Sequence, residues 1–177
     1  MKRLLTAIFV LALIGASFYS CKKDETTHNP NNSITITGTF TIGDNTFTNP
    51  TFDLGEPTNH VGSYRIYTLP ATVNGLEFYP KNDIDLGNNV TLSYENEIYS
   101  AATGTADMFA EFHFYLNGTL FTLYSETATA KVTKIDAVGG YIEGTYEGTF
   151  YEPTRKNQTS YSIKGSFKVE HIAEPAK

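Results

Sequence analysis

The chain has 177 residues and a formal net charge of −6, and 40% of its residues are hydrophobic. That length suits one domain, and the apolar content supports a conventional core, so disorder over most of the chain is excluded. The acidic balance disfavours nucleic acid as a partner. Phe and Tyr are abundant, Trp is absent and Thr recurs in alternating segments, a composition typical of strands rather than helices.

The first twenty residues have the layout of a signal peptide. Lys2 and Arg3 form a charged start, and Leu4–Ile14 is apolar apart from Thr6. That stretch fits a signal peptide and falls short of the roughly 20 residues that a membrane-spanning helix needs. We therefore assign residues 1–20 to a signal peptide, whose removal takes away two positive charges and leaves −8 on the remainder.

The chain has one cysteine, Cys21, so it forms no intrachain disulfide. Ser20-Cys21 resembles the relaxed lipobox of Bacteroidota-type lipoproteins, although Phe18 stands where a stricter consensus has Leu. The resemblance implies cleavage before Cys21 and acylation of that residue. Several acyl chains on one residue anchor a protein durably to a membrane. The alternative is an ordinary signal peptide followed by an incidental cysteine.

The residues after the cysteine are polar and have no periodicity. Lys22–Glu25 resembles the charged export signal of some of these lipoproteins, which implies the outer membrane and the cell exterior; the alternative is a solvated linker. We assign residues 21–32 to the lipidated cysteine and a flexible tether, and residues 33–177 to a single domain.

From Ser33 onward the dominant period of the sequence is two. Ile34, Ile36, Phe40 and Ile42 alternate with threonines, which predicts a strand with one apolar face. Three pairs predict hairpin turns because their residues tolerate a positive φ: Asn74-Gly75, Asn117-Gly118 and Gly139-Gly140.

The segments 141–151 and 161–170 each alternate between apolar and charged or hydroxylated residues. We predict that they pair as an antiparallel hairpin with Glu147 opposite Lys164 and Glu143 opposite Lys168. In that register every inward glycine faces a large side chain. The predicted pairs are Gly144 with Phe167, Gly148 with Ile163, and Gly165 with Tyr146.

No segment of the domain has convincing helical spacing over ten residues, and Ala101–Phe109 forms at most a turn or two. The prediction is an all-β fold, an antiparallel β-sandwich of about nine or ten strands; a barrel is the alternative if the edges close. The last fifty or so residues resemble the C-terminal half of small Bacteroidota-type lipoproteins of unknown function. That resemblance bears on fold and location only.

The sequence offers little catalytic chemistry. It has no Gly-x-Ser-x-Gly motif, and its four histidines have no metal-ligand spacing. Carboxylates two or four residues apart occur at Glu95 and Glu97 and at Glu143 and Glu147, a spacing that glycoside hydrolysis could use. Lys168 and Lys164 explain the second pair better. We expect no enzyme and no cofactor.

Two weaker signals concern ligands. Asp83 and Asp85 lie in an oxygen-rich segment that suits Ca²⁺, although a plain turn explains it better because no bidentate Glu follows. Four tyrosines are expected on polar strand faces, where they can meet a glycan or another protein. They are Tyr67, Tyr115, Tyr141 and Tyr151.

These features favour a non-catalytic binding or adhesion module on the cell surface. One alternative is a structural or accessory subunit of an outer-membrane assembly, which would need a broad apolar patch. The other is a lipocalin-like carrier of an apolar ligand, which would need a closed barrel with an internal void.

Overall fold

The computed structural model describes residues 32–42, 44–153 and 159–174. The predicted signal peptide, Cys21 and the tether up to residue 31 lie outside the described residues. Asn32, the last residue assigned to the tether, is fully buried. Its side chain donates to the carbonyl of Gly55 (3.2 Å) and accepts from the backbone N–H of Lys168 (2.9 Å). The folded domain therefore includes Asn32.

The described residues form twelve strands and one short 3₁₀ helix, η1 (Pro57–Asn59), so the all-β class is confirmed. The strands are β1 (Ser33–Thr37), β2 (Thr39–Ile42), β3 (Asn45–Thr48), β4 (Thr51–Asp53), β5 (His60–Thr68), β6 (Thr72–Pro80), β7 (Ile84–Asp85), β8 (Val90–Ile98), β9 (Gly104–Leu116), β10 (Thr119–Ile135), β11 (Tyr141–Tyr151) and β12 (Ser160–His171).

The strand number exceeds the nine or ten expected for two physical reasons. Gly38 adopts a φ of 125° and bends the first predicted strand into β1 and β2, although its four apolar residues are all buried as predicted. The strands β4 and β7 have only three and two residues, too few for a sequence pattern. The segment Ala101–Phe109, expected to form at most a helical turn or two, forms no helix, and β9 begins within it at Gly104.

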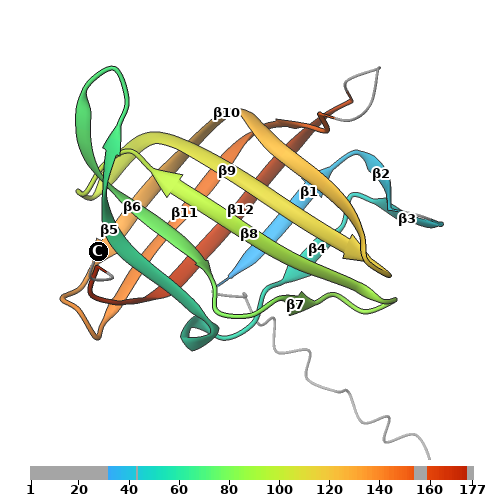
Figure 1. The fold of residues 1–177 in the computed structure, drawn as a ribbon, viewed down its shortest axis with the longest axis horizontal. Helices are drawn as coiled ribbons and strands as arrows, with labels where there is room; N and C mark the ends of the chain where they lie inside the picture. The colour runs from blue at the N-terminus through green and yellow to red at the C-terminus, as the bar shows by residue number, and fades with distance from the viewer. Residues whose placement is uncertain (1–31, 43, 154–158, 175–177) are drawn as a thin grey trace, which may run out of the picture.

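The sheet has two walls that face each other across one core, as a sandwich requires (Figure 1). One wall contains β6, β8 and β9, and the other contains β11, β12 and β1. Hydrogen-bonded neighbours follow the order β11-β10-β9-β8-β6-β5-β12-β1-β4, and β11 also pairs with β12. The strands from β11 through β5 to β12 therefore form a closed ring that joins the two walls into one continuous sheet. All these pairings are antiparallel except β5 with β12, which is parallel over two residue pairs.

The pairing of β11 with β12 has the predicted register. Glu147 lies opposite Lys164 and Glu143 opposite Lys168, while Gly144, Gly148 and Gly165 lie opposite Phe167, Ile163 and Tyr146. Large side chains thus cover the glycines on the inner face, and charges of opposite sign alternate on the outer face. A register slip of one residue would exchange these faces.

Two of the three predicted turns are confirmed. Asn117 and Gly118 both have a positive φ between β9 and β10, and Gly139 does so between β10 and β11. The turn at Asn74-Gly75 is wrong. Both residues lie within β6, opposite Ile66 and Arg65, and the chain turns at residues 69–71 instead.

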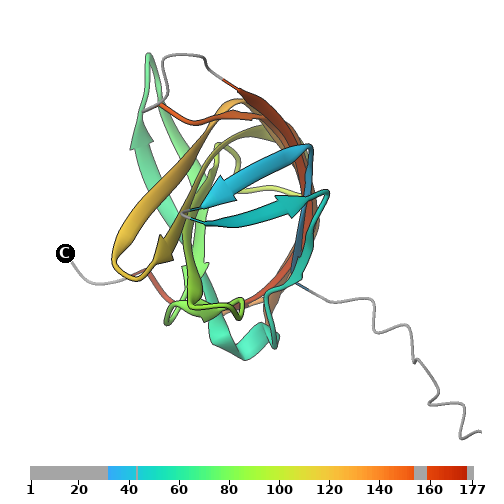
Figure 2. The same ribbon diagram turned by 90° about the vertical axis from the view of Figure 1, so that its right-hand side faces the viewer.

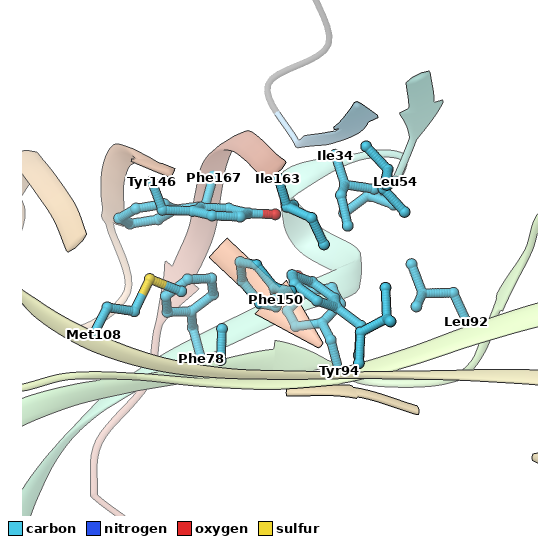
Figure 3. Packing of buried hydrophobic residues seen from close by; sticks show 14 of the residues in the cluster. Ile34, Leu54, Phe78, Leu92, Tyr94, Met108, Tyr146, Phe150, Ile163 and Phe167 are labelled. Carbon is cyan, nitrogen blue, oxygen red and sulfur yellow. The ribbon is translucent and has the colours of Figure 1, made fainter. Parts of the chain in front are cut away.

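The core is rich in aromatic rings that meet between the two walls (Figure 3). Phe78 from β6 stacks on Phe167 from β12 with centroids 4.5 Å apart, and Phe112 from β9 contacts Phe150 from β11 at 5.4 Å. Burial of rings of this size is the main stabilising contribution in a chain without a disulfide.

The hairpin of β2 and β3 lies across one end of the closed sheet, where Figure 2 shows it in blue and cyan. Phe40 on β2 is buried there and contacts rings from three other strands. They are Phe114 at 5.6 Å, Phe121 at 5.8 Å and Tyr161 at 6.0 Å. The hairpin therefore closes this end of the core.

The glycine at position 165 leads to the first prediction. A Cβ atom there would collide with the ring of Tyr146 and with the backbone oxygen of Ser33. We expect Gly165→Val to lower the free energy of unfolding by about 1–3 kcal/mol through overpacking, measured by urea denaturation. Ser162→Val, on the exposed face of the same strand, is the control. A loss below about 0.5 kcal/mol for Gly165→Val would contradict the pairing.

Candidate functional site

The outer face of β6, β8 and β9 carries four glutamates that the sheet places side by side. We call Glu77, Glu95, Glu97 and Glu111 the glutamate patch. Glu77 on β6 lies opposite Glu97 on β8, and Glu95 on β8 lies opposite Glu111 on β9. Like charges directly opposite each other destabilise a sheet. The patch is thus an arrangement that local folding energetics disfavour.

Glu77 is the most enclosed member of the patch, with 4% of its surface exposed. The Arg65 side chain on β5 donates from Nε to its carboxylate, and 43% of that arginine side chain is exposed. The hydrogen bond to Glu77 raises the pKa of Arg65. A buried carboxylate needs such a partner, because an unpaired buried charge is costly.

The other two carboxyls near Glu77 hold their protons more tightly than usual. Hydrogen bonding to Glu77, with burial and the neighbouring negative charges, raises the pKa of Glu95 to about 7. Burial raises the pKa of Glu97, opposed by a hydrogen bond from the Tyr99 hydroxyl (3.4 Å). Near neutral pH the Glu95 carboxyl is therefore partly protonated.

The far side of the patch is bordered by β9 and β10. His113 Nε2 lies 3.0 Å from an oxygen of Glu111, and its Nδ1 lies 3.2 Å from the Thr122 hydroxyl. The Tyr124 hydroxyl hydrogen-bonds to Glu111, which raises the pKa of that tyrosine. Glu111 is thus satisfied from two sides, in contrast to Glu95.

A shallow pocket of about 340 Å³ lies at the centre of this face. Its polar lining residues are Arg65, Glu77, Tyr79, Ser93, Glu95 and His113. Aromatic rings lie at the margins of the glutamate patch. Tyr67 and Tyr99 meet edge to face at 5.4 Å, and Phe109 and Tyr124 lie 6.5 Å apart. Carboxylates thus lie between aromatic rings on one face.

The four tyrosines predicted to face a ligand do not form one cluster, although all are half-buried on outer strand faces. Tyr67 borders the patch, Tyr151 contacts Tyr124 at 6.2 Å, and Tyr115 contacts His113 at 6.5 Å. Tyr141 lies elsewhere, with Lys168 Nζ 4.9 Å from its ring centre. The structure therefore brings three of the four toward the same face.

A second outer surface, a polar groove of about 680 Å³, extends over β10, β11, β12 and β1. Its charges are compensated. Glu143 lies 3.2 Å from Lys168 and 3.6 Å from Lys134, and Glu147 lies opposite Lys164. This surface contains the alternating ladder predicted from the sequence and lacks the opposed like charges of the glutamate patch.

Asp83 and Asp85, the weak calcium candidates, line a third pocket of about 370 Å³ together with Asp53. An oxygen of Asp85 accepts the N–H of Gly87 at 2.8 Å, and an oxygen of Asp53 accepts the N–H of Gly55 at 2.9 Å. These carboxylates stabilise their own turns. Within the described ranges, no three His, Cys, Asp or Glu side chains are grouped to hold a metal ion.

Comparison with known proteins found no similar chain. No protein-family model, curated protein or solved structure matches. Among the residues that the structure describes, no helix has the length and apolar character needed to cross a membrane.

Sequence reasoning missed Glu77 and Arg65, which make the central contact of the face. The signal was present, because Glu77 stands between Leu76 and Phe78 and Arg65 between Tyr64 and Ile66 in an alternating pattern. The turn wrongly predicted at residues 74–75 shortened the strand that carries Glu77. Pairing of the complete β5 and β6 brings both residues to the same face.

The raised pKa of Glu95 leads to a second prediction. Folding lifts this carboxyl from 4.5 to about 7, so the stability that its proton contributes is complete below about pH 4.5 and is lost as the pH rises through about 7. Glu95→Gln keeps the protonated shape. We expect urea denaturation to find this variant more stable than the native chain at about pH 7.5, by roughly 0.5–1 kcal/mol after allowance for solvent screening.

At about pH 3 the two proteins should have equal stability, since Glu95 is then protonated in both the folded and the unfolded state of the native chain. Glu147→Gln on the opposite face is the control and should show no gain at the higher pH. Equal stabilities of Glu95→Gln and the native chain at both pH values would contradict the raised pKa of Glu95.

Proposed function

We propose that this chain is a lipid-anchored protein of the outer membrane that faces the cell exterior and acts as a non-catalytic binding or adhesion module. The address and anchor rest on residues 1–25, above all on the lipobox resemblance at Ser20-Cys21. The binding surface that we propose is the face of β5, β6, β8 and β9 that carries the glutamate patch. An extracellular protein or glycan is its ligand.

The observation that carries this proposal is the opposition of Glu77 with Glu97 and of Glu95 with Glu111. Strand pairing gains nothing from these contacts, and the polar groove on the other wall has a compensated ladder instead. Sites that break local folding rules are typically functional. Aromatic rings and a shallow pocket on the same face add area that a ligand can contact.

The geometry of the carboxylates supports binding rather than hydrolysis. Glycoside hydrolysis needs two carboxyls on opposite sides of the scissile bond. Glu77 and Glu95 lie on the neighbouring strands β6 and β8 of one open wall, and Arg65 holds Glu77. Two carboxyls on the same wall do not flank a substrate bond from opposite sides.

The two alternatives find less support. An accessory subunit needs a broad apolar patch, whereas the exposed large hydrophobics of the described chain lie on three different hairpins: Ile66 and Leu69 on the first, Leu120 on the second and Val138 on the third. A carrier needs internal space, and the space between the walls is occupied by the aromatic core.

The anchor is tested by cell fractionation. We expect Cys21→Ala to give a soluble or unprocessed product instead of a processed membrane-bound one, because the acyl chains would be absent. Protease added to intact cells should digest the native domain and spare a variant with alanine at positions 22–25. A processed Cys21→Ala product that stays on the membrane would contradict the anchor, and native protein shielded from protease would contradict the outward orientation.

The binding face is tested with cells that display the full chain, incubated with arrays of extracellular proteins and glycans. We expect Glu95→Lys with Glu111→Lys to reduce capture of the bound ligand by at least about tenfold, the usual effect of losing central contacts. The matched control is Glu143→Lys with Glu147→Lys, which makes the same charge change on the polar groove. Equal loss in both variants, or capture by neither the native chain nor the control, would count against this face.

A further inference from the structure

The charges on the glutamate patch are out of balance. Four carboxylates share the face with one permanent cation, Arg65, which contacts Glu77. His113 contacts only Glu111 in the patch, at 3.0 Å. Glu95 and Glu97 have no cation within ion-pair distance among the described residues.

We propose that the glutamate patch binds the lysine or arginine side chains of a basic polypeptide segment. This inference rests on the proposed function and specifies its ligand. A cationic group placed over Glu95 would also lie near Glu111 on β9 and near Glu77 on β6. One positive charge of the ligand would therefore reduce the repulsion between Glu95 and each of these two neighbouring carboxylates. Charge complementarity therefore favours a basic partner over a neutral or acidic one.

Two hydroxyls provide a second, independent observation. Ser63 lies directly opposite Glu77 on the same face and is 1% exposed, and its hydroxyl has no hydrogen-bond partner in the protein. The Tyr67 hydroxyl is also buried without a partner, and the charges of Glu97 and Glu77 act on it. Buried polar groups normally have partners. Unmatched hydroxyls beside the carboxylates leave hydrogen-bonding capacity at this face that the described protein groups do not use.

The arrangement suits an organic cation better than a metal ion. The carboxylates are spread over three neighbouring strands, which lie about 4.8 Å apart. Within the described part of the chain, no three His, Cys, Asp or Glu side chains are grouped so that they could hold a metal ion. The aromatic rings of Tyr67, Tyr99 and Phe109 lie at the margin, where they can contact the apolar stem or the cationic head of a long basic side chain.

Binding should be coupled to proton release, because a ligand cation favours the ionised form of Glu95, whose pKa is raised in the free protein. The titratable and charged groups that surround Glu95 come from all the neighbouring strands. They are Arg65 and Tyr67 on β5, Glu77 and Tyr79 on β6, Glu97 on β8, Glu111 and His113 on β9, and Tyr124 on β10. Affinity should therefore rise with pH as Glu95 loses its proton.

The experiment uses the full lipidated chain in detergent and a fluorescent tetra-arginine peptide as the probe. We expect binding at low salt to tighten about three- to tenfold between roughly pH 6 and pH 8. Glu95→Gln with Glu97→Gln should weaken it at least about tenfold at the higher pH and remove the pH dependence. The control, Glu143→Gln with Glu147→Gln, loses the same two charges from the polar groove and should bind within about twofold of the native chain.

Folding is checked by thermal unfolding, and the patch variant should unfold at or above the temperature of the native chain. Equal weakening in both double variants would show a general response to net charge and overturn the proposal. So would displacement of the probe by millimolar CaCl₂ with saturation at one ion per chain. A neutral glycan captured by the same face in the display experiment, with no binding of the probe, would overturn the basic ligand and leave the proposed binding function standing.

Discussion

The structure depends on the pairing of β11 with β12, because this ladder closes the path of hydrogen-bonded strands that runs from β11 through β10, β9, β8, β6 and β5 to β12. The inner glycines Gly144 and Gly165 let the rings of Phe167 and Tyr146 cross to the neighbouring strand. The outer face of the same ladder alternates glutamate with lysine. One register therefore satisfies packing and charge together, and the core that it encloses stabilises a chain that has no disulfide.

The outer face of the opposite wall has a different arrangement of charges. Strands β6, β8 and β9 bury Phe78, Tyr94 and Phe112 on the inside as efficiently as the first wall does. Their outer positions carry like charges opposite each other and a buried carboxylate, and the neighbouring β5 carries two buried hydroxyls without partners. The stability gained by burying the core exceeds the cost of these unfavourable outer positions. Unfavourable contacts at surface positions cost too little to unfold the domain. The contrast between the walls makes the glutamate patch the candidate for function.

Alternation of residue types predicted the strand faces well, and the β11–β12 register followed from two independent patterns on its two faces. Closure of the sheet was not predictable, since β5 and β12 pair over only two residues that are far apart in the sequence. The Asn74-Gly75 turn was predicted wrongly because the tertiary contact of Tyr67 over Gly75 overrides a local preference. Glu95 and Glu97 were recognised as a pair, but their partners on β6 and β9 depend on strand order, which the sequence pattern does not encode.

The burial of Asn32 has a mechanical consequence under the proposed anchor. Tension between the membrane and a ligand on the glutamate patch would enter the domain at Asn32, whose side chain is bonded to the carbonyl of Gly55 and to β12. The load would next reach β1, which is held along both edges by β12 and β4. Detachment of β1 would require both ladders to break together. An attachment point held in this way resists force, which the proposed adhesion module would need.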